Sequence, residues 1–262
     1  MPASDTDRLI AAAEAAADVA GAVVRPFFRA GIAADLKSDR SPVTIADRSA
    51  EQAMRAVLSE RFPDHGILGE EYGSTRPDAP YQWIIDPIDG TRSFMMGLPT
   101  WGTLIALTHQ GVPVLGVMGQ PFTGEVFWST RQGARTQGPL GELALAVRPC
   151  SGLAEAVLGS THPSLFRTSR QLQRFEAVAG KVKLARYGGD CYLYALLAAG
   201  MVDLIVEANL QSFDVAALIP IIERAGGIIT TWAGRPALEG GEIIAAGDQR
   251  VYKEALAVLN AT

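Results

Sequence analysis

The chain has few of the residues on which several kinds of protein depend. Its 262 residues include only two cysteines, Cys150 and Cys191, and three histidines. The cysteines lie far apart and form no CxxC pair, and the histidines show no HExxH or similar spacing. We therefore expect neither a disulfide-stabilised fold nor a zinc site. Both cysteines are expected to be small buried side chains in a protein of the reducing cytoplasm.

Long apolar runs and an excess of basic charge are also missing. No run approaches the roughly 20 apolar residues that are needed to cross a bilayer. Residues 1–30 contain Asp5, Asp7, Glu14 and Asp18 in place of the basic start and apolar block of a signal peptide. The net charge of −5 argues against a nucleic-acid partner, which calls for a clustered basic face. The sequence predicts a soluble, cytoplasmic protein with no membrane and no nucleic acid among its partners.

The pattern of apolar residues divides the chain into a helical start, a β-rich stretch and an alternating end. Spacings of three and four residues predict helices over about 5–30 and 46–62. Short apolar runs separated by Gly and Pro predict strands at 67–68, 83–85, 103–107, 112–117 and 125–128. Further strands are predicted at 157–160, 182–184, 202–205 and 228–231, between helices near 165–179, 191–199, 213–225 and 251–260. We expect one domain over 1–262, with an N-terminal α+β lobe over about 1–145 and a C-terminal α/β lobe over about 146–262.

The most informative stretch is 83–91, in which an apolar run leads into Asp-Pro-Ile-Asp-Gly-Thr. If the strand ends at Asp86, a tight turn brings the carboxylates of Asp86 and Asp89 and the carbonyl of Ile88 to one centre. Gly90 permits a sharp turn, and the N–H groups after it can point at an anion. Oxygen ligands next to phosphate oxygens suit Mg²⁺. The stretch therefore predicts metal-assisted chemistry on a phosphate ester.

Several other charged residues have both a functional and a structural interpretation. Glu70 follows a separate apolar run and can add a carboxylate from a neighbouring strand end. Asp214 opens a helical segment and is either its N-cap or a further ligand. Glu207 follows another apolar run and either projects into a pocket or is a surface charge. Lys37 and Asp47 flank a polar loop, where solvated charges around a helix start are the alternative.

The spacing of the acidic residues excludes two known arrangements. Asp86 and Asp89 are separated by two residues, whereas haloacid-dehalogenase-type phosphatases use Asp-x-Asp. An EF-hand loop needs alternating ligands with Gly at position six and Glu at position twelve. The sequence also has no Gly-x-Ser-x-Gly elbow and no Walker loop. A turn held by Asx hydrogen bonds is the structural alternative for Asp86 and Asp89.

Together these motifs resemble the inositol monophosphatase superfamily of Mg²⁺-dependent, lithium-sensitive phosphatases. The matching segments are 69–71, 86–91 and 213–217 with 225–227, which occur in the family order over essentially the whole chain. Phe213 departs from the Trp or Tyr of many relatives but keeps an aromatic side chain. The resemblance implies an α+β fold, a layered αβαβα sandwich in which two β-sheets are interleaved with helix layers. It also implies a catalytic domain that forms a homodimer.

The resemblance implies a set of metal ligands. Glu70, Asp86 and the carbonyl of Ile88 would bind a first Mg²⁺, and Asp86, Asp89 and Asp214 a second. Two or three ions per subunit are implied, because some members hold a third, weaker metal. Asp86 is then also a catalytic residue, since it belongs to both main sites.

The resemblance also implies how water and phosphate are held. Thr91, with Glu70, would orient the attacking water, so both are predicted catalytic residues. The amides of Gly90 and Thr91 would bind the phosphate. Lys37 and Asp47 match the loop that assists the third metal site.

Within the superfamily, several details resemble bacterial histidinol-phosphatases. Thr-Arg-Ser-Phe at 91–94 stands where inositol monophosphatases commonly carry Asn before the Phe. This implies hydrolysis of L-histidinol phosphate to L-histidinol and phosphate by a metal-activated water, as a step of histidine biosynthesis. The ammonium and imidazole of that substrate call for an acidic subsite, for which Asp190 and Glu207 are the candidates. Arg92 is expected to bear on substrate choice.

Two alternatives stay open. The first substrate alternative is myo-inositol monophosphate, a neutral polyol whose hydroxyls Glu207 can also bind. The second alternative is a metal-binding regulator that has lost catalysis, against which the complete set of carboxylates and Thr91 argues.

Overall fold

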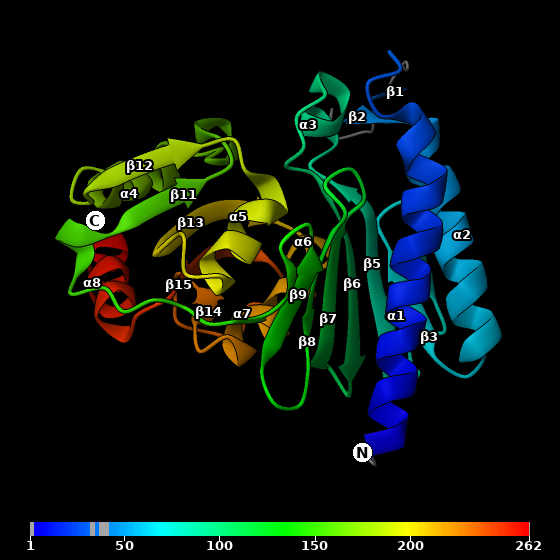
Figure 1. Ribbon diagram of the computed structural model, residues 1–262. Coiled ribbons are helices and arrows are strands. Elements are labelled where there is room, and N and C mark those ends of the chain that lie inside the picture. Colours follow the sequence, from blue (N-terminus) through cyan, green and yellow to red (C-terminus); the bar gives the residue numbers. More distant parts are fainter. Residues whose placement is uncertain (1–2, 32–34, 37–41, 262) are drawn as a thin grey trace.

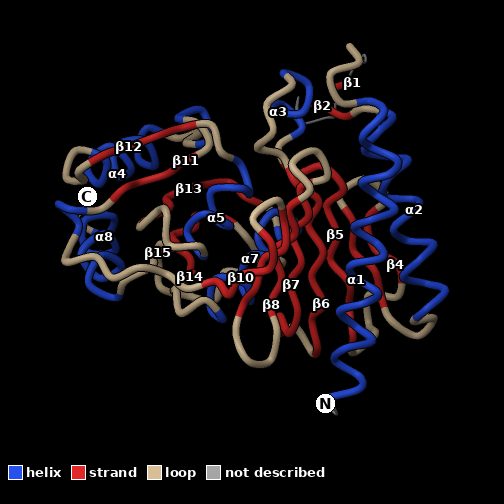
Figure 2. Tube along the Cα trace, viewed as in Figure 1, coloured by secondary structure: helices blue, strands red, loops and turns tan. Residues whose placement is uncertain are grey.

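Helices and sheets alternate in five layers in the computed structural model, which describes residues 3–31, 35–36 and 42–261. The first layer is formed by α1 (Ala3–Val24) and α2 (Ile45–Arg61), which cover one face of an eight-stranded sheet (Figure 1). A central helix layer separates this sheet from a five-stranded sheet, and two further helices cover the outer face of the smaller sheet (Figure 2). This arrangement is an αβαβα sandwich, which confirms the predicted fold class.

The larger sheet has the strand order β10-β9-β8-β7-β6-β5-β3-β4. Its strands are β3 (Gly66–Gly69), β4 (Gly73–Thr75), β5 (Tyr81–Asp89), β6 (Gly102–His109), β7 (Val112–Gln120), β8 (Glu125–Ser129), β9 (Ala134–Gly138) and β10 (Gly141–Leu145). Only β3 and β5 pair in parallel, with Gly69 opposite Ile85. Glu70, which follows Gly69, and Asp86, which follows Ile85 within β5, therefore lie next to each other at the same end of these two strands. A separate pair, β1 (Asp35–Leu36) and β2 (Pro42–Val43), precedes α2.

The smaller sheet is mixed and has the strand order β12-β11-β13-β15-β14. Its strands are β11 (Val157–Ser160), β12 (Leu184–Tyr187), β13 (Leu204–Leu210), β14 (Ile228–Thr231) and β15 (Gly241–Ala246). The remaining α-helices are α3 (Thr91–Met96), α4 (Ser169–Ala179), α5 (Asp190–Ala198), α6 (Ser212–Val215), α7 (Leu218–Arg224) and α8 (Gln249–Asn260). Short 3₁₀ turns occur at Arg25–Phe27, Leu153–Glu155 and Pro163–Leu165. None of the helices among the described residues combines the length and the apolar character that crossing a bilayer requires.

Both sheets contribute to one hydrophobic core around the central helices. Ile84 and Leu104 of the larger sheet and Ile205 and Ile243 of the smaller sheet belong to the same buried cluster as α5 and α7. A second cluster lies between the larger sheet and the first helix layer, where fully buried alanines such as Ala16 let α1 lie close to its neighbours. The two sheets are thus joined through packed apolar side chains, and a site between them is held from both sides.

Most predicted elements are present, but the sequence pattern does not predict six of the described strands (β1, β2, β4, β9, β10 and β15), the helix α3 or a break in one helix. β9 is partly exposed and β10 is largely exposed, and neither contains the long apolar run that predicts a strand. β15 is missed although it is buried. The predicted helix 213–225 is divided into α6 and α7 around Ala217, and the predicted strand 182–184 lies instead at Leu184–Tyr187.

Gly116 on β7 lets the central helix layer approach the larger sheet closely. A Cβ atom at this position would overlap the carbonyl oxygen of Ala217 and lie 2.8 Å from Cγ of Pro220. Ala217 lies at the break between α6 and α7, and α6 carries Asp214. The absence of a side chain at Gly116 therefore sets the distance between the sheet and the helix that carries a predicted ligand.

We predict that Gly116→Ala lowers the free energy of unfolding by about 1–3 kcal/mol, because an added methyl group must displace backbone atoms. Gly119→Ala, on the same strand, is the matched control, since its Cβ would make only an ordinary 3.6 Å contact with Ala17. Urea unfolding followed by circular dichroism measures both variants. Equal stability of the two would show that the close approach at Gly116 is unimportant.

Candidate active site

The end of β5 brings Asp86 and Asp89 to the same side of the strand. In a regular strand, residues three positions apart point to opposite faces. Here Asp86 is opposite Leu104 and Asp89 is opposite Gly102, so β5 has one residue more than β6 between these pairs. Such a bulge reverses the alternation, which turns both carboxylates toward one space. The strand does not end at Asp86, which was the condition for the predicted turn; β5 continues to Asp89 through this irregularity.

Asp214 reaches the same space from the first turn of α6. The side chain is not the N-cap, which was one of its two interpretations; Gln211 occupies that position. Asp214 is the third helical residue, and its Oδ2 accepts a hydrogen bond from the Gln211 amide at 2.7 Å. The capping bond fixes this side chain at the helix start, where the positive end of the peptide dipoles favours a carboxylate.

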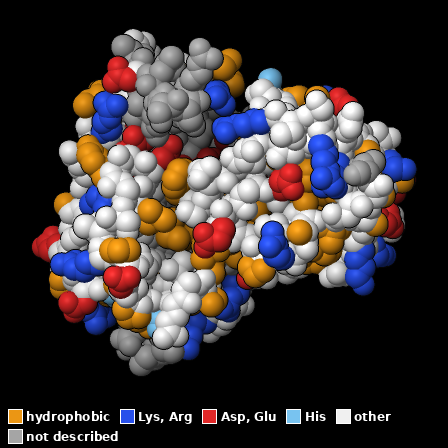
Figure 3. Space-filling model, turned by 180° about the vertical axis from the view of Figure 1, so that it is seen from behind, with side chains coloured by type: hydrophobic (Ala, Val, Ile, Leu, Met, Phe, Trp, Pro, Cys, Tyr) orange, Lys and Arg blue, Asp and Glu red, His pale blue; other side chains and the backbone are white. Residues whose placement is uncertain are grey.

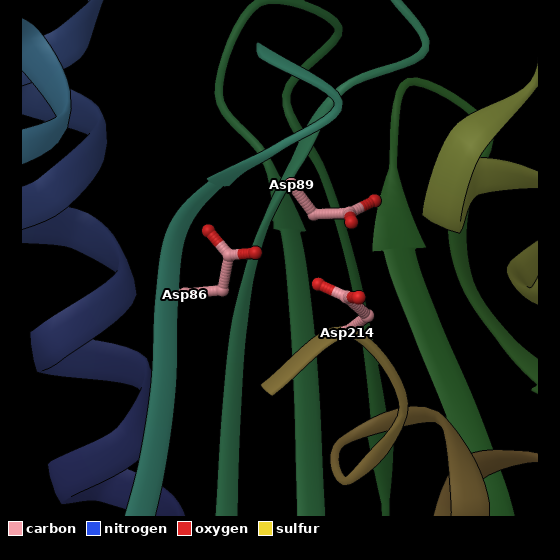
Figure 4. Close-up of side chains that lie close together, drawn as sticks. All are labelled: Asp86, Asp89 and Asp214. Carbon is pink, nitrogen blue, oxygen red and sulfur yellow. The ribbon is translucent and has the colours of Figure 1, made fainter. Parts of the chain in front are cut away.

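The three aspartates form a compact group. Each offers a carboxylate oxygen that lies within 4.8 Å of the oxygens of the other two, and Figure 4 shows the side chains directed toward a common space. Asp86 is only 1% exposed. Burial raises the pKa of Asp86 well above its ordinary value, and the charges of Glu70, Asp89 and Asp214 raise it further. The same effect raises the pKa of Asp89, where burial comes first and Asp214 second.

This accumulation of acidic oxygens fits a hard divalent cation. Among the described residues the group consists of carboxylates alone, without a nitrogen or sulfur ligand, and Ile88 lines the same cavity. A cation placed among these oxygens would remove the mutual repulsion that raises the pKa of Asp86 and Asp89. The residues present therefore fit Mg²⁺ better than zinc or another soft metal.

Glu70 and Thr91 border the aspartate group. Glu70 lines the same cavity, and its charge acts on Asp86. Thr91 is the first residue of α3, and its hydroxyl contacts the Ile88 carbonyl oxygen at 3.2 Å and Oδ1 of Asp47 at 3.4 Å. Gly90 precedes it with φ +84°, a conformation in which glycine is strongly favoured. The predicted roles of Glu70, Gly90 and Thr91 toward water and phosphate stay predictions.

Only Asp47 of the two predicted third-metal residues belongs to the part of the chain that the structure describes. Asp47 is 1% exposed and forms a capping box with Thr44 at the start of α2, so the interpretation as a solvated charge is wrong. Its contact with Thr91 places it at the edge of the aspartate group. Lys37 lies outside the described residues.

A cavity of about 790 Å³ opens from the aspartate group between the two sheets. In the space-filling view, acidic side chains lie in the hollow between the two halves, with Lys or Arg side chains beside it (Figure 3). Asp190, Glu207 and Arg92 all lie in the cavity wall, Arg92 on its exposed part. Contact of these three with a substrate stays a prediction.

The two acidic wall residues are held differently. Oδ2 of Asp190 accepts hydrogen bonds from the Ser93 hydroxyl at 2.5 Å and the Thr100 hydroxyl at 3.0 Å, so it connects α5 with the segment around α3. Glu207 is 2% exposed and accepts from the Thr161 amide at 2.6 Å and the Tyr194 hydroxyl at 2.9 Å. Burial raises the pKa of both carboxyls above their usual values.

Sequence reasoning missed several residues that hold these side chains. The amide of Cys191 donates to Oδ2 of Asp89 at 2.9 Å, and Tyr194 fixes Glu207. Main-chain donors leave no signal in the sequence, because any residue except proline can supply them. Tyr194 did leave a signal in the sequence, because it lies four residues after Asp190 and therefore on the same face of a helix.

Comparison with known proteins agrees with this geometry. The layered sandwich and the acidic oxygens gathered at the end of β5 are the features that the sequence motifs predict for a phosphate-ester hydrolase. The model of the inositol monophosphatase family matches residues 5–261, so the chain belongs to the inositol monophosphatase family and is a phosphatase of that family. A chloroplastic bifunctional phosphatase of Arabidopsis thaliana is 43% identical over 97% of this chain and 76% of its own length.

Two other relatives carry more specific names. A histidinol-phosphatase of Chlorobaculum parvum is 35% identical over 93% of both chains. The structure of an inositol monophosphatase from Zymomonas mobilis superposes with a TM-score of 0.87 at 44% identity and covers 99% of both chains. The relatives agree on the family and differ in the organic part of the substrate.

We predict that Mg²⁺ raises the thermal midpoint of the wild-type protein by about 5 °C or more at saturating concentration, because a cation held by the aspartate group would stabilise the folded state over the unfolded state. Asp86→Asn should abolish this rise. In EDTA the variant should be at least as stable as the wild type, since the amide keeps the 2.9 Å hydrogen bond from Ile88 and removes one repelling charge. Scanning fluorimetry measures both midpoints; an equal Mg²⁺-induced rise would contradict the assignment of Asp86.

Proposed function

We propose that this phosphatase is Mg²⁺-dependent and hydrolyses L-histidinol phosphate. One observation supports it above others. Glu207, a buried carboxylate, faces the same cavity as the aspartate group, so a cationic organic part and a phosphate can be bound together. The 35% identity to a histidinol-phosphatase over nearly the whole of both chains supports the same substrate.

The metal would be held by the residues gathered at the end of β5. Asp86, Asp89 and Asp214, which form the aspartate group, would supply oxygen ligands for two or three Mg²⁺ together with Glu70 and the carbonyl of Ile88, two residues that line the same cavity. When bound, Mg²⁺ lowers the pKa of a water molecule and neutralises charge on the attacking and leaving oxygens. This contribution is large because uncatalysed monoester hydrolysis is among the slowest biological reactions.

The protein's own residues would place the water and the phosphate. The Thr91 hydroxyl is oriented by the Ile88 carbonyl and by Asp47, and with Glu70 it would hold a water in line for attack on phosphorus. The amides of Gly90 and Thr91, at the start of α3, would bind the phosphate oxygens. No covalent phospho-enzyme is proposed, since water is the nucleophile.

The organic part of the substrate would lie toward Glu207. An ammonium or imidazolium group there favours the charged form of this carboxylate, which burial otherwise disfavours. Oδ2 of Asp190 already accepts two hydroxyl hydrogen bonds, so Glu207 is the main candidate for this contact.

A second candidate substrate is inositol monophosphate. The 44% identity to the inositol monophosphatase of Zymomonas mobilis favours it, and the carboxylate of Glu207 can accept hydrogen bonds from a polyol. A regulator without catalysis is disfavoured because the carboxylates and Thr91 are all present at one site.

We predict Mg²⁺-dependent phosphate release from L-histidinol phosphate with a higher kcat/KM than from inositol 1-phosphate or 3′-phosphoadenosine 5′-phosphate. Lithium should inhibit the reaction by competing for a metal position. A colorimetric phosphate assay with and without lithium measures all three substrates. Preference for inositol 1-phosphate would replace the proposed substrate, and no release from any of them would favour the non-catalytic alternative.

We predict that Glu207→Gln raises KM for L-histidinol phosphate about tenfold, equivalent to about 1.4 kcal/mol. The KM for inositol 1-phosphate should rise much less. The amide can accept from Thr161 and donate to the Tyr194 oxygen, so the change removes chiefly the charge. Glu125→Gln is the matched control, because Glu125 also accepts from a tyrosine, Tyr192, but lies outside the cavity wall. An equal rise in KM for both substrates would rule out recognition of a cation by Glu207.

A further inference from the structure

Glu51 is a buried acidic residue that the proposed chemistry does not use. It lies on α2, four residues after Asp47 and four before Arg55, and its side chain is 0% exposed. Burying a carboxylate is costly unless it is paired and hydrogen-bonded. Its contacts therefore indicate what the residue does.

The Glu51 carboxylate contacts the turn between β3 and β4. Its Oε2 accepts a hydrogen bond from the Glu71 amide at 2.6 Å, and its Oε1 accepts from the Tyr72 amide at 3.2 Å. Gly69 lies so close that a Cβ atom there would overlap Oε1 of Glu51. One carboxylate thus contacts the residues on both sides of Glu70 in the chain.

Arg55 connects this carboxylate to the far side of the same turn. Its Nε donates to Oε1 of Glu51 at 2.8 Å, and its two terminal nitrogens donate to the Thr75 hydroxyl and to the Gly73 carbonyl oxygen. The two side chains therefore hold the backbone from Gly69 to Thr75 through one network of charge-assisted hydrogen bonds.

We propose that Glu51, supported by Arg55, is a positioning residue that directs Glu70 toward the aspartate group. This rests on the proposed function, in which Glu70 binds metal and orients water. β3 and β5 are parallel neighbours with Gly69 opposite Ile85, so a shift of the turn moves Glu70 relative to Asp86. Because Glu51 fixes successive amides directly after Glu70, it sets the direction in which that side chain leaves the backbone.

The test is Glu51→Gln, a change that keeps the shape and removes one acceptor. We expect the Mg²⁺ concentration for half-maximal phosphate release to rise about tenfold, as is typical when a partner of a metal ligand is removed. Isothermal titration calorimetry with Mg²⁺ alone should show the same weakening. Amide hydrogen exchange at Glu71 and Tyr72 should accelerate in the Mg²⁺-free protein.

Asp203→Asn is the matched control. Asp203 is also buried, accepts from the Val157 amide at 2.8 Å and pairs with Arg148, but it lies outside the cavity wall. This variant should lose stability, while its dissociation constant for Mg²⁺ stays within about twofold of the wild-type value. Should Glu51→Gln fail to fold, Arg55→Gln is the second variant. It leaves in place the two hydrogen bonds that the Glu51 carboxylate accepts from main-chain amides, and it should also weaken Mg²⁺ binding, by a smaller factor.

The outcomes separate the two proposals. A folded Glu51→Gln protein with wild-type Mg²⁺ affinity and wild-type amide exchange would overturn the positioning role and leave the proposed function intact. An equal loss of Mg²⁺ affinity in Asp203→Asn would also overturn it, because general destabilisation would then explain the effect. A wild-type protein that neither binds Mg²⁺ nor releases phosphate would overturn the proposed function and, with it, the role of Glu51.

Discussion

The clustered carboxylates of this protein repel one another, and the rest of the site depends on the contacts that hold them in place against this repulsion. Each of the three clustered aspartates accepts a hydrogen bond from a main-chain amide: Asp86 from Ile88, Asp89 from Cys191 and Asp214 from Gln211. A hydrogen bond to the ionised form of a carboxylate partly offsets the cost of burying it. The backbone thereby fixes buried carboxylate oxygens that their mutual repulsion would otherwise separate.

These amides come from different layers of the sandwich. Ile88 belongs to β5 of the larger sheet, Cys191 to α5, and Gln211 directly precedes α6. The cluster is therefore complete only when the larger sheet and the central helix layer pack together, and the shared core around α5 and α7 provides that packing. Folding and assembly of the site are in this sense one event.

The sequence allowed the fold and the central carboxylates to be predicted, because apolar periodicity and the 86–91 motif are local signals. It did not reveal how Asp86 and Asp89 converge, since a bulge depends on the register of the partner strand β6. Asp214 could be placed at a helix start but not at the correct capping position. Glu51 has a different kind of signal, which the apolar periodicity of its helix does not include: it is a charged residue among buried positions.

The use of main-chain donors has a consequence for how such a protein can diverge. Amide groups are independent of side-chain identity, so the main-chain hydrogen bonds that Cys191 and Gln211 donate do not by themselves restrict which residue occupies either position. Glu207 is held by one amide and by Tyr194, a side chain that a single substitution removes. The main-chain contacts of the aspartate group are thus less sensitive to substitution than the side-chain contact that holds Glu207 in the cavity wall. One architecture can in this way give rise to enzymes that differ only in the molecule they release.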